Sequence, residues 1–337
     1  MSSRATTTSA ARGSSTTSGP VDDCTAALPP SEGSQGAEHA EPPRRRRDRN
    51  GFALARDGTS IYYEVSGLEP PAPTLLLCDG IGCDGYVWRY LQRVLGEHHR
   101  VVHMHYRGHG RSPAPADPER VSVGDLAEDA VAVLDACQAE RAVLCGHSMG
   151  VQVALETFRR SPQRVAALVL VCGSYGHPLR TFKGKSTLEE VLPLVRLVAA
   201  RLPRLVTTLW THLVPTDLAY QIATRVEING PLIRRQDFFP YLEGMARIDV
   251  RLFLNMLSKA GQHTARETLP QVSVPTLIVA GRRDSFTPMA LSEEMQRLIP
   301  GAELYVVEEG SHTAPIERPA EVSKVIEDFL RRRLPRS

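Results

Sequence analysis

Short apolar runs alternate with amphipathic stretches along most of this chain. Runs such as TLLLCDG, AVLCG and VAALVLVCG suit strands buried on both faces, and YVWRYLQRVL and SVGDLAEDAVAVLDAC carry apolar residues at helical spacing, the latter with Ser122 as an N-cap. In residues 51–67, two short runs flank the turn signal Asp57-Gly58 and predict a β-hairpin. The pattern predicts an α/β fold with a doubly wound, mostly parallel sheet.

The same pattern divides the chain into four parts. Residues 1–50 are rich in Ser, Thr, Pro, Gly and Ala, and we expect a disordered N-terminal tail. Residues 51–174 read as the first part of the sheet domain. Residues 175–268 are rich in Leu and Arg, have helical periodicity and contain no strand-like run, so they predict a helical cap insertion. Strand and helix patterns return in residues 269–337, the second part of the core.

Composition and charge place the chain among ordinary globular proteins. It is 42% hydrophobic and 23% charged, and 40 basic against 38 acidic residues give a net charge of +2. This balance gives no electrostatic reason to expect nucleic acid as a partner. A weak anionic contact through the run Arg44, Arg45, Arg46 and Arg47 is one interpretation of the tail, and a solvated linker is the other.

The cysteines and the hydropathy indicate a reduced, cytoplasmic protein. No CxxC pair and no cluster with metal-ligand spacing is present among Cys24, Cys78, Cys83, Cys137, Cys145 and Cys172. No run approaches the length of a transmembrane segment, and the N-terminus has no apolar core of a secretory signal. No phosphate-binding or dinucleotide motif occurs. We therefore expect no metal, no cofactor and no membrane span.

A strand, a tight turn and a helix meet at Ser148. An apolar run ends at Gly146, and a helical pattern begins at Met149. Gly146 and Gly150 thus lie two residues before and two residues after the serine. Glycines there remove side chains that would clash across the turn, so the hydroxyl projects above the sheet. The N-terminus of the following helix favours negative charge nearby. We interpret Ser148 as a displayed nucleophile.

Two further strand ends carry residues of matching chemistry. Asp284 lies four residues beyond Ala280, where the run TLIVA stops, and His312 follows the run LYVVEE. Catalytic groups gather at the carboxyl ends of parallel strands. A serine becomes nucleophilic when an imidazole accepts its proton, and a buried carboxylate fixes the tautomer of that imidazole. Ser148, Asp284 and His312 therefore predict a catalytic triad.

The motifs GHSMG, GRRDSFTP, GSHTAPIERP and YRGHGRS together resemble those of the α/β-hydrolase fold superfamily, in its capped, esterase- and lipase-like form. The resemblance runs from residue 51 to the C-terminus and is specific for the fold but weakly specific for the substrate. It implies that Ser148 is the nucleophile, His312 the general base and Asp284 the acid that orients His312.

The resemblance also implies an oxyanion hole, and the sequence departs from the family near it. One amide donor would come from Met149 and the other from Ile81, in the loop CDGIGC. Where most relatives have His-Gly and Asp-x-Arg-Gly, this chain has Asp79-Gly and His105-x-Arg-Gly. Because this exchange is reciprocal, we expect Asp79 and His105 to form a hydrogen-bonded pair that braces the loop. Two unrelated exchanges, with Asp79 capping its own turn, remain the alternative.

Other residues near these motifs have simpler interpretations. We interpret Cys83, His109 and His147 as ordinary loop or lining residues, and Tyr86 and Trp88 as packing residues. The large side chains of the cap either line an acyl-binding cavity or form a small core of their own; with its leucines, these are Phe182, Trp210, Phe238, Phe239, Tyr241 and Phe253. The richness in Leu and Val favours an apolar part in the substrate.

These features predict a serine hydrolase with a small-molecule acyl substrate. The expected reaction is cleavage of a carboxylic ester or lactone with an apolar acyl part, through an acyl-enzyme intermediate. An acyltransferase or a C–C bond hydrolase would use the same triad. A ligand receptor that keeps the fold without turnover is a further alternative.

Overall fold

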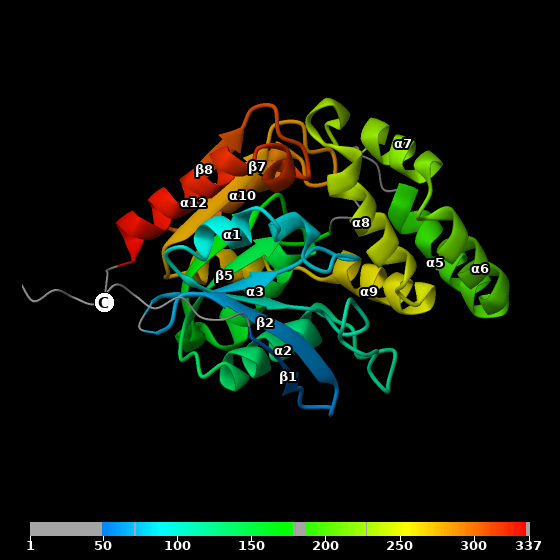
Figure 1. Ribbon diagram of the computed structural model, residues 1–337, viewed down its shortest axis with the longest axis horizontal. Coiled ribbons are helices and arrows are strands. Elements are labelled where there is room, and N and C mark those ends of the chain that lie inside the picture. Colours follow the sequence, from blue (N-terminus) through cyan, green and yellow to red (C-terminus); the bar gives the residue numbers. More distant parts are fainter. Residues whose placement is uncertain (1–48, 71, 178, 180–186, 227, 335–337) are drawn as a thin grey trace, which may run out of the picture. The chain divides into compact units, whose positions relative to one another are not determined.

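One eight-stranded sheet organises the computed structural model, which describes residues 49–70, 72–177, 179, 187–226 and 228–334 (Figure 1). Its strands follow the spatial order β1-β2-β4-β3-β5-β6-β7-β8. Their bounds are Arg49–Leu54 (β1), Ser60–Gly67 (β2), Thr74–Cys78 (β3), Arg100–Met104 (β4), Ala142–His147 (β5), Val165–Val171 (β6), Thr276–Gly281 (β7) and Glu303–Val307 (β8).

The pairing confirms a mostly parallel, doubly wound sheet. β1 and β2 form the predicted antiparallel hairpin, β2 pairs antiparallel with β4, and every pair from β4 to β8 is parallel. At the hairpin turn, Gly58 has a φ of 84° and Asp57 Oδ1 accepts a hydrogen bond from the amide of Thr59 at 3.1 Å. A positive φ suits glycine because it has no Cβ.

Helices cover both faces of this sheet. α2 (Val123–Ala136), α3 (Met149–Arg160) and α10 (Met289–Leu298) contribute to the apolar core on one face, and α1 (Leu91–Leu95) and α12 (Pro319–Arg333) to the core on the other. Short helices connect them: η1 (Tyr86–Trp88), η2 (Pro162–Arg164), η5 (Arg266–Gln271) and α11 (Ala314–Glu317). The predicted cap Ser122 forms a capping box with Asp125 at the start of α2.

Strand β3 shows why its apolar run is continuous. Leu75 and Leu77 belong to the core on one face, and Leu76 and Cys78 to the core on the other. Alternate residues of a strand point to opposite faces, so a strand covered on both sides needs an apolar residue at each position. Burying one leucine in this way contributes about 1.5–3 kcal/mol.

The described residues between β6 and β7 form helices. These are α5 (Thr187–Arg201), α6 (Pro203–Leu213), α7 (Asp217–Val226), η4 (Gly230–Leu232), α8 (Arg235–Ala246) and α9 (Val250–Gln262). The two ends of the segment meet in an isolated β-bridge between Gly176 and Thr264. α5 packs on α9, and Trp210 and Phe253 contact each other with ring centroids 5.0 Å apart in a small core of this segment.

Several sequence expectations fall outside the described residues. These are the interpretations of Arg44 to Arg47, Cys24 and Phe182, together with nearly all of the expected tail. Strand β1 begins at Arg49, within the last two residues assigned to that tail. In the part of the chain that the structure describes, no helix has the length and hydropathy needed to cross a bilayer.

Candidate active site

Ser148 occupies a strained turn between β5 and α3. Its backbone has φ 55° and ψ −118°, a conformation that a residue with a Cβ adopts at an energetic cost. Its amide donates to the carbonyl oxygen of Val171 at 3.1 Å. A Cβ added at Gly146 would clash with the backbone of Gly150, and one at Gly150 with the carbonyl of Cys78. The glycines therefore allow α3 to begin directly against β3.

Ser148, His312 and Asp284 form one chain of hydrogen bonds. His312 Nε2 lies 2.9 Å from Ser148 Oγ, and His312 Nδ1 lies 3.0 Å from Asp284 Oδ2. Asp284 comes three residues after β7, and His312 five residues after β8. The structure thus brings together the three residues that the strand ends singled out.

The carboxylate of Asp284 is fixed and charged. It is almost completely buried, and its Oδ1 accepts from the amides of Phe286 and Thr287, each at 2.8 Å, while Thr287 Oγ1 donates to Oδ2 at 2.7 Å. Burial acts to raise the pKa of Asp284, but the charge of His312 and these hydrogen bonds lower it below its ordinary value. An ionised Asp284 can only accept, so His312 donates from Nδ1 and leaves Nε2 as the acceptor for the hydroxyl of Ser148.

Two buried groups hold the loop that carries His312. Glu317, on α11, accepts from the amide of Ser311 at 2.6 Å, from its hydroxyl at 2.5 Å and from Thr313 Oγ1 at 3.0 Å. His147 Nε2 donates to the carbonyl oxygen of His312 at 2.9 Å. Sequence reasoning missed Glu317, although an acid soon after His312 on a short helix is a visible signal.

The loop after β3 lies directly beside Ser148. A Cβ at Gly80 would be 3.1 Å from the Cβ of Ser148, a tight contact, so the backbone of Gly80 lies close against Ser148. Ile81 follows in this loop, and Met149 is the first residue of α3. Ile81 and Met149, the two expected amide donors, therefore directly follow two residues that lie against each other, Gly80 and Ser148.

His109 holds this loop through a hydrogen bond to its backbone. The amide of Gly82 donates to His109 Nε2 at 3.1 Å, and His109 Nδ1 donates to the carbonyl oxygen of Arg107 at 3.1 Å. Burial lowers the pKa of His109 to about 4, which keeps the ring neutral and able to accept. Arg107 is itself buried and forms a two-pronged ion pair with Asp129 of α2, at 2.8 and 2.5 Å.

Asp79 pairs with His103, and the expected pair with His105 is wrong. Asp79 Oδ2 accepts from His103 Nε2 at 2.8 Å, with both side chains buried. His103 and His105 share one face of the chain because they are two residues apart, and His105 Nδ1 is taken by the amide of Arg111 at 3.0 Å. The signal for His103 is a second polar residue in the apolar run RVVHMHY.

The two histidines have opposite charge preferences. Burial acts to lower the pKa of His103, but the charge and hydrogen bond of Asp79 raise it above the ordinary value. Burial and the charge of His103 lower the pKa of His105 to about 4. The contact with Asp79 therefore favours the charged form of His103, while burial favours the neutral form of His105.

Cap helices α8 and α9 reach the same loop. A Cβ at Gly82 would lie 3.3 Å from the ring of Phe253 and 3.4 Å from the sulfur of Met245. Tyr86 stacks on Tyr241 with ring centroids 4.6 Å apart, and Trp88 is fully buried. Through these contacts, α8 and α9 of the helical insertion pack against the loop after β3 at Gly82 and Tyr86.

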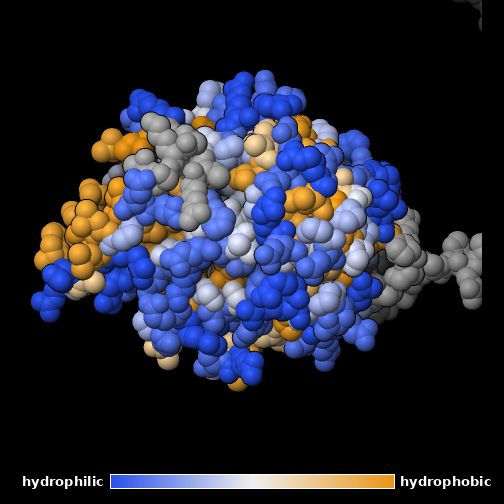
Figure 2. All heavy atoms as spheres, turned by 180° about the vertical axis from the view of Figure 1, so that it is seen from behind, coloured by the Kyte–Doolittle hydropathy of each residue, from blue (hydrophilic) through white to orange (hydrophobic). Residues whose placement is uncertain are grey.

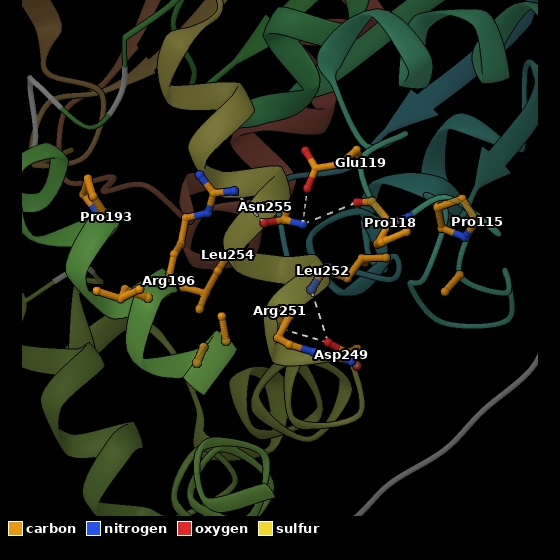
Figure 3. A pocket seen from close by; sticks show the side chains of 14 residues that line it. Pro115, Pro118, Glu119, Pro193, Arg196, Asp249, Arg251, Leu252, Leu254 and Asn255 are labelled. Carbon is orange, nitrogen blue, oxygen red and sulfur yellow. Dashed lines mark hydrogen bonds and ion pairs between the residues drawn. The ribbon is translucent and has the colours of Figure 1, made fainter. Parts of the chain in front are cut away.

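A cavity of about 620 Å³ is lined by α5, α9 and the loop that carries Pro115, Pro118 and Glu119 (Figure 3). Arg196 of α5 extends across it and donates to Asn255 Oδ1 at 2.9 Å and to Ser258 Oγ at 3.2 Å. Leu252 lines this cavity, and the lining residues include none of the hydrogen-bonded chain at Ser148. The cavity therefore does not define the space above the serine.

The cysteines of the described part are all free and buried: Cys78, Cys83, Cys137, Cys145 and Cys172. Burial, followed by the charges of Asp79 and Asp84, raises the pKa of Cys83 well above its ordinary value, so its thiol stays protonated. In the ranges that the structure describes, no three His, Cys, Asp or Glu side chains are placed to share a metal ion.

Comparison with known proteins extends these observations. A family model described as "alpha/beta hydrolase fold" matches residues 73–319. A putative carbamate hydrolase RutD of Variovorax paradoxus is 28% identical over 276 residues, which cover 81% of this chain and 96% of that protein. The 3-oxoadipate enol-lactonase 1 of Acinetobacter baylyi is 26% identical, with 82% and 95% covered. The crystal structure of an enol-lactonase from Burkholderia xenovorans LB400 superimposes with a TM-score of 0.68 at 23% identity, covering 83% of this chain and 100% of the other.

Proposed function

The chain belongs to the α/β-hydrolase fold family, and from that premise we propose that it is a serine hydrolase of carboxylic esters or lactones with an apolar acyl part. The observation that carries the proposal is the hydrogen-bonded chain Ser148–His312–Asp284 at the strained turn before α3. Relatives named as a carbamate hydrolase and an enol-lactonase support hydrolysis of a carbonyl substrate.

In the proposed reaction, Ser148 Oγ attacks the carbonyl carbon while His312 Nε2 takes the hydroxyl proton. The tetrahedral oxyanion would be stabilised by the amides of Ile81 and Met149. As the C–O bond breaks, the imidazolium returns the proton to the leaving oxygen, which leaves an acyl-enzyme on Ser148. Water, deprotonated by His312, then attacks the acyl carbon, and His312 returns that proton to Ser148 Oγ as the bond from the acyl carbon to Oγ breaks and the acid leaves. Asp284 holds the ring in the tautomer that both steps need.

The charge of Asp79 is compatible with this reaction. An unpaired carboxylate beside Gly80 would oppose the developing oxyanion. The ion pair with His103 at 2.8 Å cancels that charge, and Tyr106 donates its hydroxyl to the carbonyl oxygen of Asp79 at 2.9 Å, which fixes the strand end. The departure from the family pattern thus leaves the loop neutral and braced.

The transferase, C–C hydrolase and receptor alternatives are compatible with the same arrangement of Ser148, His312 and Asp284. The later steps separate them, because a transferase delivers the acyl group to another acceptor, a C–C hydrolase breaks a carbon–carbon bond, and a receptor completes no turnover. The ester and lactone hydrolases among the structural and sequence relatives favour water as the acceptor.

The test is hydrolysis of p-nitrophenyl esters of increasing acyl length by the wild type and Ser148→Ala. We expect turnover in the wild type and a loss on the order of 10⁶-fold in kcat in the variant. Ser323→Ala is the matched control, because Ser323 is a buried serine on α12 whose hydroxyl has no hydrogen-bond partner. Equal turnover by wild type and Ser148→Ala would refute the mechanism.

A further inference from the structure

The cap exposes an apolar surface far from Ser148 in the chain. Of thirteen large apolar side chains that are exposed in the described part of the molecule, eleven lie between Val191 and Ile222. Figure 2 shows these side chains gathered at the edge of the molecule that carries α5 and α6. We call six of them the outer cap face: Val191, Leu194, Val198, Leu205, Leu209 and Leu213, each 42–61% exposed.

Both helices carry apolar residues on two sides, and the described part of the chain packs against one of them. On the inner side, Leu192 and Ala199 are buried in the small core with Val250 and Leu254 of α9. On the outer side, the residues of the outer cap face recur at helical spacing along α5 and α6. A helix that is apolar all round is typical of a position inside a protein or against lipid, and not of a surface in contact with water.

The charges at the junction of α5 and α6 are positive, while the acids of α5, Glu189 and Glu190, lie in its first turn. Between Glu190 and Asp217 the chain has no acidic residue, and its charged side chains there are arginines. Arg201 and Arg204 are exposed, and neither forms an ion pair with a described residue. Cationic groups beside an exposed leucine surface complement anionic lipid headgroups next to acyl chains.

A second copy of the chain suits this face less well. A twofold interface that brings the α5–α6 junctions of two copies together would set Arg201 and Arg204 against their equivalents, because Glu189 and Glu190 lie at the other end of α5. We propose that the outer cap face docks on an anionic lipid bilayer, with α5 and α6 lying in the plane of its interface. This docking needs no membrane-spanning helix and does not depend on Ser148.

Vesicle flotation of the full-length protein tests the proposal. We expect binding to vesicles of phosphatidylcholine mixed with phosphatidylglycerol, and weaker binding to phosphatidylcholine alone or in high salt. The variant Leu205→Glu with Leu209→Glu should partition at least about ten-fold more weakly, because it removes two apolar side chains from the interface and adds negative charge. Its melting temperature should stay that of the wild type, which shows that it folds.

Two variants serve as controls. Phe52→Glu with Leu54→Glu changes the other two exposed apolar side chains, on β1, and should bind vesicles as the wild type does. Replacing Arg44, Arg45, Arg46 and Arg47 by Gln measures the contribution of the tail, which should be smaller than that of the cap. The proposal is overturned if the wild type does not bind, if the cap variant binds equally well, or if the tail variant alone loses binding. A dimer that the cap variant dissociates, without vesicle binding, would assign the face to self-association instead.

Discussion

At the scale of single residues, the pair Asp79–His103 sets the charge beside the proposed oxyanion hole. Replacing His103 by Leu leaves the buried carboxylate of Asp79 without its cation, and removing one partner of such a pair typically costs about 3–5 kcal/mol. We expect His103→Leu to lower the free energy of unfolding in urea by that amount. We also expect kcat on p-nitrophenyl esters to fall more than KM changes, since a bare carboxylate opposes the transition state.

A double-mutant cycle separates this pair from its neighbour. Asp79→Asn combined with His103→Leu should lose much less stability than the sum of the two single losses, because the single variants each break the same contact. The matched cycle with His105→Leu should be close to additive, since His105 bonds to the amide of Arg111. Additivity in the first cycle and coupling in the second would show that our assignment of the partner is wrong.

The residue scale also shows what the sequence could and could not foresee. Ser148, Asp284 and His312 were visible because each follows a recognisable strand, and the sheet brings strand ends together. The partner of Asp79 was not visible, because two histidines share one face of the chain and only three-dimensional distances decide between them. Thr287 lies in a short loop and Glu317 on the short helix α11, and the residue pattern does not specify which groups their side chains reach.

At the scale of elements, the turn between β5 and α3 depends on glycines at fixed positions. A Cβ at Gly150 would meet the backbone carbonyls of Cys78 and Asp79, which cannot move without shifting β3. We expect Gly150→Ala to lower the unfolding free energy by more than about 3 kcal/mol, or to prevent folding. Chemical denaturation measures this.

Gly301 provides the control for that substitution. It has a φ of +70° and open space where a Cβ would lie, so Gly301→Ala carries only the backbone strain of about 1–2 kcal/mol. If Gly150→Ala proved no more costly than Gly301→Ala, close approach of α3 to β3 would not explain the glycine at 150.

Elements with local sequence signals were predictable, and the packing of helices with two apolar faces was not. The hairpin at Asp57-Gly58, the strand β3 and the cap of α2 at Ser122 all follow from local rules, and the structure confirms them. The sequence predicts that the leucines of residues 175–268 line a cavity or form a small core. Helical periodicity locates apolar faces, but it cannot tell which of them finds a packing partner, so only the structure reveals the outer cap face.

At the scale of the whole molecule, three buried histidines predict acid sensitivity. Burial is the largest cause that lowers the pKa of His105, His109 and His147 to about 4 from an ordinary 6.5. Below pH 6.5 the unfolded chain binds protons that the folded protein excludes, so stability falls as the pH drops from 6.5 toward 4. Each group can contribute about 3 kcal/mol over that range. Burial raises the pKa of Asp129 to about 6 and also raises that of Asp84, and these two carboxyl groups oppose the histidines.

Calorimetry between pH 7 and pH 4.5 checks this expectation. The melting temperature should fall steadily over this range. Below pH 6.5 His103 adds no slope, because the stabilisation from its raised pKa is complete below the unfolded value and is lost only as the pH rises above it. A melting temperature that stays constant down to pH 4.5 would contradict the buried, neutral state of the three rings.

The central claim is that Ser148 becomes covalently acylated, and trapping tests it most directly. A fluorophosphonate with an alkyl chain reacts with an activated serine by losing fluoride, and intact-protein and peptide mass spectrometry then locate the adduct. We predict one adduct, on Ser148, at a rate that falls sharply in His312→Ala. An adduct on another residue, or ester turnover that continues in the fully labelled protein, would contradict the account.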